Sequence, residues 1–183
     1  CDVPNELDVH VVHAGTGRPA ENGDTLFVDY TGVKATTGDM FDTSYLRGVP
    51  LDFVLGRGSV ILGWDVGLLG TRPGEVVKLD IPAAMAYADT PPQGSDIAPG
   101  EALTFLDEVR AVVPPTTPDD APLDLLVEPS DGATEVTTVD AVVGDGAEVT
   151  PRSTAVVHML LVRGDNLKVL LDTWERGEPL QVP

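Results

Sequence analysis

The chain has 183 residues, which is long enough for one sizeable hydrophobic core or two small ones. Thirty acidic residues against eleven basic ones give a net charge of −19, and a surface this acidic repels phosphate backbones, so we expect no nucleic-acid partner. One cysteine excludes an internal disulfide and any multi-cysteine metal site, and three scattered histidines do not suit a histidine site. We therefore expect no metal and no other cofactor. No apolar run reaches the ~18 residues that a membrane span needs.

The numbered chain begins at Cys1 instead of methionine. Mature bacterial lipoproteins begin with a lipid-modified cysteine, and exported proteins have lost their signal peptide. The start therefore predicts lipidation of Cys1, a membrane tether and an extracytoplasmic location. A cloning boundary that falls on a cysteine is the alternative.

Strand patterns dominate the first hundred residues. Apolar and polar residues alternate along 26–31, 76–81 and 103–109, with the period of strands that bury one face, and 51–55 forms a further short strand. Residues 36–39, Thr-Thr-Gly-Asp, predict a turn between the first of these strands and its neighbour.

The last predicted strand contains one misfit. Asp107 has the same parity as Leu103, Phe105 and Val109, so the pattern places its carboxylate on the buried side. An unpaired carboxylate is costly to bury. We therefore expect a bulge, an exposed strand end or a partner at this position.

One segment has helical periodicity. Apolar residues recur at helical spacing over residues 60–69, with Trp64 near the centre, and Gly70 and Pro73 end the pattern. Together with the strands, this segment predicts an α+β fold in which an antiparallel sheet of five or six strands wraps over one short helix.

A proline-rich stretch divides the chain. Residues 114–122 contain four prolines, which cannot continue a sheet ladder, so we interpret them as a semi-rigid linker of polyproline character. The linker separates a first domain, residues 1–113, from a second region, residues 123–183.

Five short motifs follow one another along the first domain: Val-Asp-Tyr-Thr-Gly at 28–32, Gly-Asp-Met-Phe-Asp-Thr-Ser at 38–44, Gly-Trp-Asp at 63–65, Ile-Pro at 81–82 and Ala-Tyr-Ala at 86–88. In that order and spacing the chain, from about residue 7 to 113, resembles the FKBP family of peptidyl-prolyl cis/trans isomerases. The resemblance implies the FKBP-like sheet over one helix and activity on X-Pro bonds of proline-containing polypeptides, here in the folding of exported proteins. It also implies affinity for macrolides of the tacrolimus or rapamycin kind.

Such an activity requires no acid, base or metal. Amide resonance opposes rotation with a barrier of ~18–20 kcal/mol, and the twisted transition state has lost that resonance. An apolar, water-poor pocket favours the twisted amide, whose C–N bond is less polarised, so that catalysis is differential binding. Aromatic walls and a few polar groups are the residue types that this mechanism needs.

The resemblance assigns roles to ten residues. Trp64 would form the floor under the prolyl ring, and the Ile61 N–H would donate to a substrate carbonyl. Tyr30, Asp42 and Tyr87 would be the catalytic polar groups, with Asp42 hydrogen-bonded to Tyr30 and the Tyr87 hydroxyl facing the substrate. Four of the remaining five would be wall residues: Phe41, Leu51, Val60 and Phe105. The fifth, Ile97, would lie in the loop that overhangs the pocket.

Two positions depart from the family pattern. Leu51 stands where the family usually has Phe, and Ala88 stands where a Gly follows the tyrosine, so both bear on substrate preference and macrolide affinity. An alternative function is therefore a non-catalytic FKBP-like chaperone or adaptor that binds proline-containing segments. A weaker alternative is a membrane-tethered scaffold with a vestigial pocket. Without the motifs, the aromatic residues would be ordinary core and Asp42 a turn cap.

The second region repeats part of the first. Residues 142–146 parallel 11–17, and 172–180 parallel 42–51, at an offset close to 130. We interpret the region as a divergent, partial FKBP-like module in which Met159 replaces Tyr30, Leu171 replaces Phe41 and only Asp172 matches Asp42. The sequence ends before any counterpart of the helix, so we expect either further sequence or self-association with another chain to complete this half.

Overall fold

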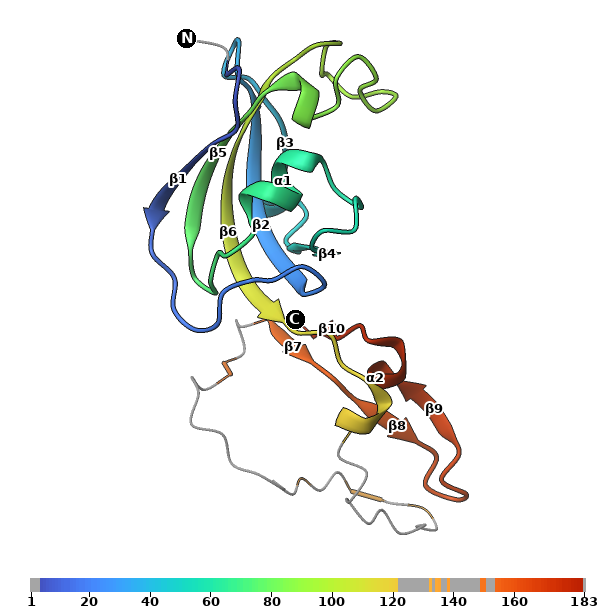
Figure 1. Ribbon diagram of the computed structural model, residues 1–183. Helices are drawn as coiled ribbons and strands as arrows, with labels where there is room; N and C mark the ends of the chain where they lie inside the picture. The colour runs from blue at the N-terminus through green and yellow to red at the C-terminus, as the bar shows by residue number, and fades with distance from the viewer. Residues whose placement is uncertain are drawn as a thin grey trace. The chain divides into compact units, whose positions relative to one another are not determined.

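A computed structural model describes residues 4–121 and 154–182, together with residues 132, 134, 135, 138, 149 and 150. The chain divides into two compact units, Cys1–Pro114 and Pro115–Pro183 (Figure 1). Cys1 and the predicted repeat at 142–146 lie outside the described residues. None of the described helices is long and apolar enough to cross a membrane.

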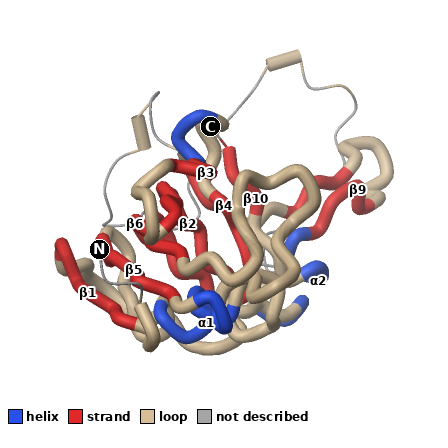
Figure 2. Tube along the Cα trace, turned by 90° about the horizontal axis from the view of Figure 1, so that it is seen from above, coloured by secondary structure: helices blue, strands red, loops and turns tan. Residues whose placement is uncertain are grey.

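The first unit is built on a six-stranded sheet in which every pairing is antiparallel. Its order is β1-β5-β6-β2-β3, and β4 pairs with the other half of β2. The strands are β1 (Asp8–His13), β2 (Thr25–Lys34), β3 (Met40–Thr43), β4 (Leu51–Val54), β5 (Val76–Ile81) and β6 (Leu103–Val113). This arrangement confirms the predicted α+β class, because a single α-helix, α1 (Leu62–Gly67), lies on one side of the sheet (Figure 2).

The periodicity predicted a helix over residues 60–69, but α1 is shorter. Ile61 is its N-cap and has extended backbone angles, φ −62° and ψ 147°, so Val60 and Ile61 belong to the preceding loop. Apolar spacing alone does not distinguish a helical turn from an extended pair that faces the same core. The difference matters for the site, because Val60 and Ile61 are predicted site residues and lie in the loop before the helix.

Two glycines let α1 approach the sheet closely. A Cβ at Gly63 would lie 2.5 Å from Ile81 Cγ2, and one at Gly67 would lie 2.9 Å from Leu79 Cδ2. Both contacts are shorter than packed side chains allow, so larger residues would push α1 away from β5. Trp64, between the two glycines, is 3% exposed and packs into the core with Phe53 and other buried residues of the sheet.

In the second unit, the described residues form two short sheets of two strands each. β7 (Ala155–Val157) pairs with β10 (Leu180–Val182), and β8 (Leu160–Val162) pairs with β9 (Val169–Asp172), while α2 (Thr173–Arg176) joins β9 to β10. Part of the predicted linker is also folded here. Residues Pro118–Asp120 form one 3-10 turn, and Asp120 accepts a hydrogen bond of 2.7 Å from the Thr117 N–H.

The ladders of the second unit repeat those around β2. Thr31 pairs with Thr43 in the first unit, and Leu160 pairs with Asp172 in the second. Val28 pairs with Leu51 in the first unit in the same way as Val157 with Leu180 in the second. All four residues of the second unit lie 129 positions after their counterparts, as from Val28 to Val157. This agreement supports the interpretation of a partial repeat, which stays a prediction.

The same register corrects two residue matches, that of Asp172 with Asp42 and that of Leu171 with Phe41. Asp172 stands at the place of Thr43 and not of Asp42, and its carboxylate caps α2 by accepting from the Trp174 and Glu175 N–H groups. Leu171 occupies the place of Asp42. The second unit therefore keeps the cap of the first but not its carboxylate at the pocket position.

Asp107 does not have the bulge, exposed end or partner that we expected. It lies in the middle of β6, opposite Tyr30 on β2 and Val77 on β5, and it is completely buried. Neither carboxylate oxygen has a hydrogen-bond partner among the described residues. Burial raises the pKa of the Asp107 carboxyl well above its usual range, so the side chain is accommodated in its neutral form.

Replacement of Asp107 by valine should stabilise the protein at neutral pH. An unsatisfied buried polar group costs about 1–3 kcal/mol, and Asp107→Val removes it. The folded pKa lies above the unfolded value of about 3.9, so the contribution of Asp107 is least unfavourable below about pH 4 and worsens as the pH rises toward the folded pKa. The gain should therefore grow between about pH 4 and pH 8 in urea unfolding followed by circular dichroism.

Asp107→Asn is the matched control, since it removes the titration but keeps a buried polar group. We expect a smaller gain than with valine, and a similar dependence on pH. An identical gain for Asp107→Val at both ends of the pH range would contradict the assignment of a neutral buried acid.

Candidate active site

A single cavity gathers most of the residues that the motifs had indicated. Its volume is about 180 Å³, and it opens between the end of β3, the loop before α1 and the loop after β5. Nine of the ten predicted site residues line it, and Ser59 is an additional member. The lining residues are Tyr30, Phe41, Asp42, Leu51, Ser59, Val60, Ile61, Trp64, Tyr87 and Phe105.

Ile97 is the predicted site residue that does not line this cavity. It lies in the loop between β5 and β6, as expected, but its side chain is buried within the hydrophobic core. Ile97 thus anchors the loop to the domain, and we assign it no direct contact with a ligand. The sequence placed it in the correct loop but carried no signal for the direction of its side chain.

The floor and walls of the cavity form one aromatic cluster. The Trp64 ring meets the Tyr30 ring edge-on at a centroid distance of 5.2 Å and the Phe105 ring at 5.3 Å, and Phe41 meets Phe105 at 5.6 Å. Edge-to-face pairs of this kind hold aromatic rings in fixed orientations. Gly32 makes the arrangement possible, because a Cβ there would lie 2.6 Å from Phe41 Cζ. The cavity therefore has a rigid apolar surface before any ligand enters.

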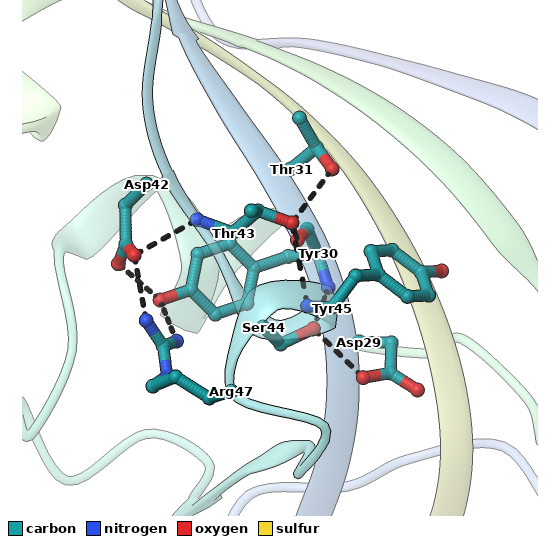
Figure 3. Close-up of polar contacts among 8 residues, drawn as sticks. All are labelled: Asp29, Tyr30, Thr31, Asp42, Thr43, Ser44, Tyr45 and Arg47. Carbon is teal, nitrogen blue, oxygen red and sulfur yellow. Dashed lines mark hydrogen bonds and ion pairs between the residues drawn. The ribbon is translucent and has the colours of Figure 1, made fainter.

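The polar wall consists of three side chains that bind one another (Figure 3). The Tyr30 hydroxyl donates to Asp42 Oδ2, as predicted. Arg47, which sequence reasoning had missed, donates from Nη1 to Asp42 Oδ1 at 2.6 Å and from Nη2 to the Tyr30 hydroxyl at 2.7 Å. The Arg47 guanidinium also lies 5.5 Å from the centroid of the Tyr30 ring. Every charge in this wall is thus compensated within the protein.

These contacts fix the protonation states of the wall. Burial alone would raise the pKa of Asp42, but hydrogen bonds from Tyr30 and Arg47 and the Thr43 N–H outweigh it and hold the pKa below its usual value. Burial, with the hydrogen bond to Asp42, raises the pKa of Tyr30 to about 12. Burial also raises the pKa of Tyr87. At neutral pH Asp42 is therefore ionised and both tyrosines are neutral.

Two buried hydroxyls hold the backbone of Tyr30 in place. Ser44 Oγ accepts from the Tyr30 N–H at 2.9 Å and donates to Asp29 Oδ1 at 2.7 Å, while Thr43 Oγ1 donates to the Tyr30 carbonyl at 2.8 Å (Figure 3). The Asp-Thr-Ser motif thus places Asp42 in the cavity and fixes the strand that carries Tyr30. Serine and threonine at these positions act as structural groups, and Asp42 alone of the three reaches the cavity.

The loop before α1 is tied down from within the helix. Asp65 accepts from the Gly56 N–H at 2.8 Å and from the Gly58 N–H at 2.9 Å, and both glycines have positive φ. The loop leads directly to Val60 and Ile61 on the cavity wall. Among the described residues the Ile61 N–H has no hydrogen-bond acceptor, so it remains available to a ligand carbonyl.

The loop after β5 brings Tyr87 to the cavity. The next residue, Ala88, has φ 48°, a left-handed conformation that favours glycine, and it is held by hydrogen bonds of 2.8 Å to Ala83 and Gly100. Ala88 is the position where the family usually has glycine, so the chain keeps the backbone conformation at some cost in strain. The Tyr87 hydroxyl has no partner among the described residues and is free to bind a ligand.

Fold and cavity together define a class of protein: an antiparallel sheet over one helix, with a preformed aromatic pocket whose lining residues include no group that titrates near neutral pH. Residues 16–109 match the family described as FKBP-type peptidyl-prolyl cis-trans isomerase. The chain belongs to this family, and its first unit is a peptidyl-prolyl isomerase domain.

Relatives and solved structures agree with this family. The chain is 45% identical over 109 residues to the "FK506-binding protein" of Streptomyces anulatus, covering 60% of this chain and 88% of the relative. It is 48% identical over 107 residues to "FK506-binding protein 1A" of Neurospora crassa, covering 58% and 88%. The crystal structure of FkpA from Escherichia coli matches with a TM-score of 0.53 and 39% identity, over 59% of this chain and 48% of that chain.

The geometry explains how such a domain accelerates rotation about an X-Pro bond. The aromatic cluster offers an apolar surface over Trp64 on which a prolyl ring would fit, and the Ile61 N–H and the Tyr87 hydroxyl could donate to carbonyl groups beside it. An apolar environment favours the twisted amide over the planar one, because the planar amide is the more polar form. Such a mechanism transfers no proton, and an Asp42 that is ionised and a Tyr30 that is neutral at neutral pH are compatible with it.

Turnover should therefore be almost independent of pH in the neutral range. Asp42 stays ionised above about pH 4 and Tyr30 stays neutral, so kcat/KM on an X-Pro peptide should vary little between about pH 6 and pH 9. Asp42→Asn should lower kcat/KM by about tenfold while leaving the profile flat. A bell-shaped dependence of kcat/KM on pH in the unmodified protein would instead reveal an essential acid or base and contradict the mechanism.

Proposed function

We propose that the chain accelerates the cis-trans isomerisation of X-Pro bonds in polypeptides that are still folding, and that its substrates are exported proteins. The observation that carries the catalytic part is the preformed apolar cavity, floored by Trp64, in which the Ile61 N–H has no acceptor among the residues that the structure describes. Uncatalysed isomerisation takes tens of seconds or more, which is slow enough to limit folding. A catalyst that requires only a proline and its flanking carbonyls suits many different chains.

The same cavity supports binding of tacrolimus-like macrolides, since two relatives carry the name FK506-binding protein. The catalytic part of the proposal predicts that the full chain accelerates two processes. One is the cis-trans isomerisation of a short X-Pro peptide in a protease-coupled assay, and the other is the proline-limited refolding of an unrelated protein. Saturating FK506 should suppress both rates, because it occupies the floor over Trp64.

A Trp174→Phe variant leaves Trp64 as the only tryptophan, so that binding can be followed by its fluorescence. We expect the fluorescence to change as FK506 saturates the site. Undiminished acceleration at saturating FK506, with binding shown by calorimetry, would place the active site elsewhere. Binding without any acceleration would favour a non-catalytic FKBP-like adaptor.

The location and assembly of the protein form the second part of the proposal. We propose that it acts outside the cytoplasm, tethered through a lipidated Cys1, and that its second unit self-associates. The exposed apolar residues Leu161, Val169 and Leu170 on short two-stranded sheets support self-association, because such sheets are marginal alone. Mass spectrometry of the protein from its own cells should find an acylated Cys1. Sedimentation of the full chain should find a mass above that of its monomer, whereas the chain without residues 114–183 should sediment as a monomer.

A further inference from the structure

Beside the cavity, the turn between β3 and β4 exposes apolar side chains. Leu46 is 83% exposed, Val49 is 52% exposed and Leu51, which also lines the cavity, is 36% exposed. We call these three residues the rim patch. Single exposed apolar residues are ordinary on a protein surface, so the significance of the patch depends on where it lies and how firmly it is held.

The rim patch is joined to the cavity at three points. The turn begins just after Asp42 and ends at Leu51, and both of these residues line the cavity. Between them Arg47, next to Leu46 in the chain, reaches back to the Asp42 carboxylate and the Tyr30 hydroxyl (Figure 3). The patch is thus a continuation of the cavity wall.

The turn that carries the patch is fixed by hydrogen bonds. Ser44, completely buried, binds the Tyr30 N–H and Asp29, and its carbonyl accepts from the Arg47 N–H at 2.9 Å and the Gly48 N–H at 3.0 Å. Gly48 has φ 68°, which closes the turn. Leu46 therefore points outward from an ordered 3-10 turn and cannot be withdrawn into the core without breaking these bonds.

The charges beside the patch suit an apolar ligand. Arg47 is the basic residue within the turn, and its guanidinium is paired with Asp42 at 2.6 Å. Leu46, Val49, Pro50 and Leu51 carry no charge. A ligand segment that covers the patch would therefore leave no unpaired charge of the turn buried beneath it.

We propose that the rim patch is a second contact site for the substrate polypeptide, selecting prolines that have apolar residues two to four positions away in the chain. This inference rests on the isomerase function of the cavity. A chain whose proline occupies the cavity must leave it over the rim, and an extended chain advances at most about 3.3–3.6 Å per residue. Residues about two to four positions from the proline therefore reach the patch. Apolar side chains there bury Leu46 and Val49 and so bind the chain more tightly.

The experiment compares two ten-residue peptides with the same central X-Pro bond. One carries leucine at the second to fourth positions on both sides of the proline, and the other carries serine. NMR exchange spectroscopy measures their cis-trans rates with the full chain, alongside a capped three-residue peptide with the proline at its centre, which has no residue two or more positions from the proline. We expect kcat/KM for the leucine peptide to exceed that for the serine peptide by about five- to tenfold, as partial burial of one or two apolar side chains would give.

The Leu46→Ser/Val49→Ser variant should bring the two long peptides to within about twofold of each other and leave the short peptide unaffected, since neither residue lines the cavity. Val9→Ser/Val12→Ser is the matched control. It removes two exposed valines from β1, at the opposite edge of the sheet from β3, and should keep the preference for leucine.

Equal rates for the two long peptides with the unmodified chain, or a preference that survives in Leu46→Ser/Val49→Ser, would overturn the rim contact but not the isomerase function. Acceleration of neither the short nor the long peptides would overturn the isomerase function itself. If Leu46→Ser/Val49→Ser instead lowered the mass in solution without changing the preference, the patch would be a contact between copies of the chain, and the inference would be wrong.

Discussion

The close approach of α1 to the sheet is the constraint on which the rest of the first unit depends. Gly63 and Gly67 face Ile81 and Leu79 at distances that leave no room for a Cβ, and Trp64 is held between them. The same side chain thus completes the hydrophobic core and forms the floor of the cavity. Stability and ligand binding cannot be separated at this position, because any change that moves the helix also moves the floor.

The polar groups of the site are held by hydrogen bonds to one another. Asp42, Tyr30 and Arg47 satisfy one another, and the hydroxyls of Thr43 and Ser44 hold the strand from behind. A polar network is favourable in a partly buried place only when its members are satisfied. The network therefore gives the cavity one fixed polar wall in which each charge is paired.

Much of this arrangement was readable from the sequence, and the failures have physical causes. Alternation located the strands because it reflects short-range geometry, and the resemblance to the FKBP family, which the motifs carry, assigned nine residues of the cavity. Arg47 was missed since a lone arginine five residues after an aspartate looks like a solvated charge until the turn brings them together. The helix was predicted too long because Ile61 faces the core in either conformation.

Two further cases show what parity and alignment leave out. Asp107 had the parity of a buried residue, but no local rule predicts that a fold will tolerate an acid there without a partner. In the second unit, an alignment by residue type differs by one residue from the alignment that the strand pairs give. Only the ladder pairs reveal that Asp172 corresponds to Thr43.

The bare N–H of Ile61 has a consequence for what the cavity tolerates. Among the described residues it has no acceptor, and it stands at the N-cap of α1, where the chain changes from extended to helical. A site that offers an unpaired donor rejects a ligand without an acceptor far more strongly than a ligand that lacks a methylene group. The domain should thus be stricter about the main-chain carbonyl beside the proline than about the side chains around it. Such a division allows one catalyst to serve many chains while still binding some of them more tightly than others.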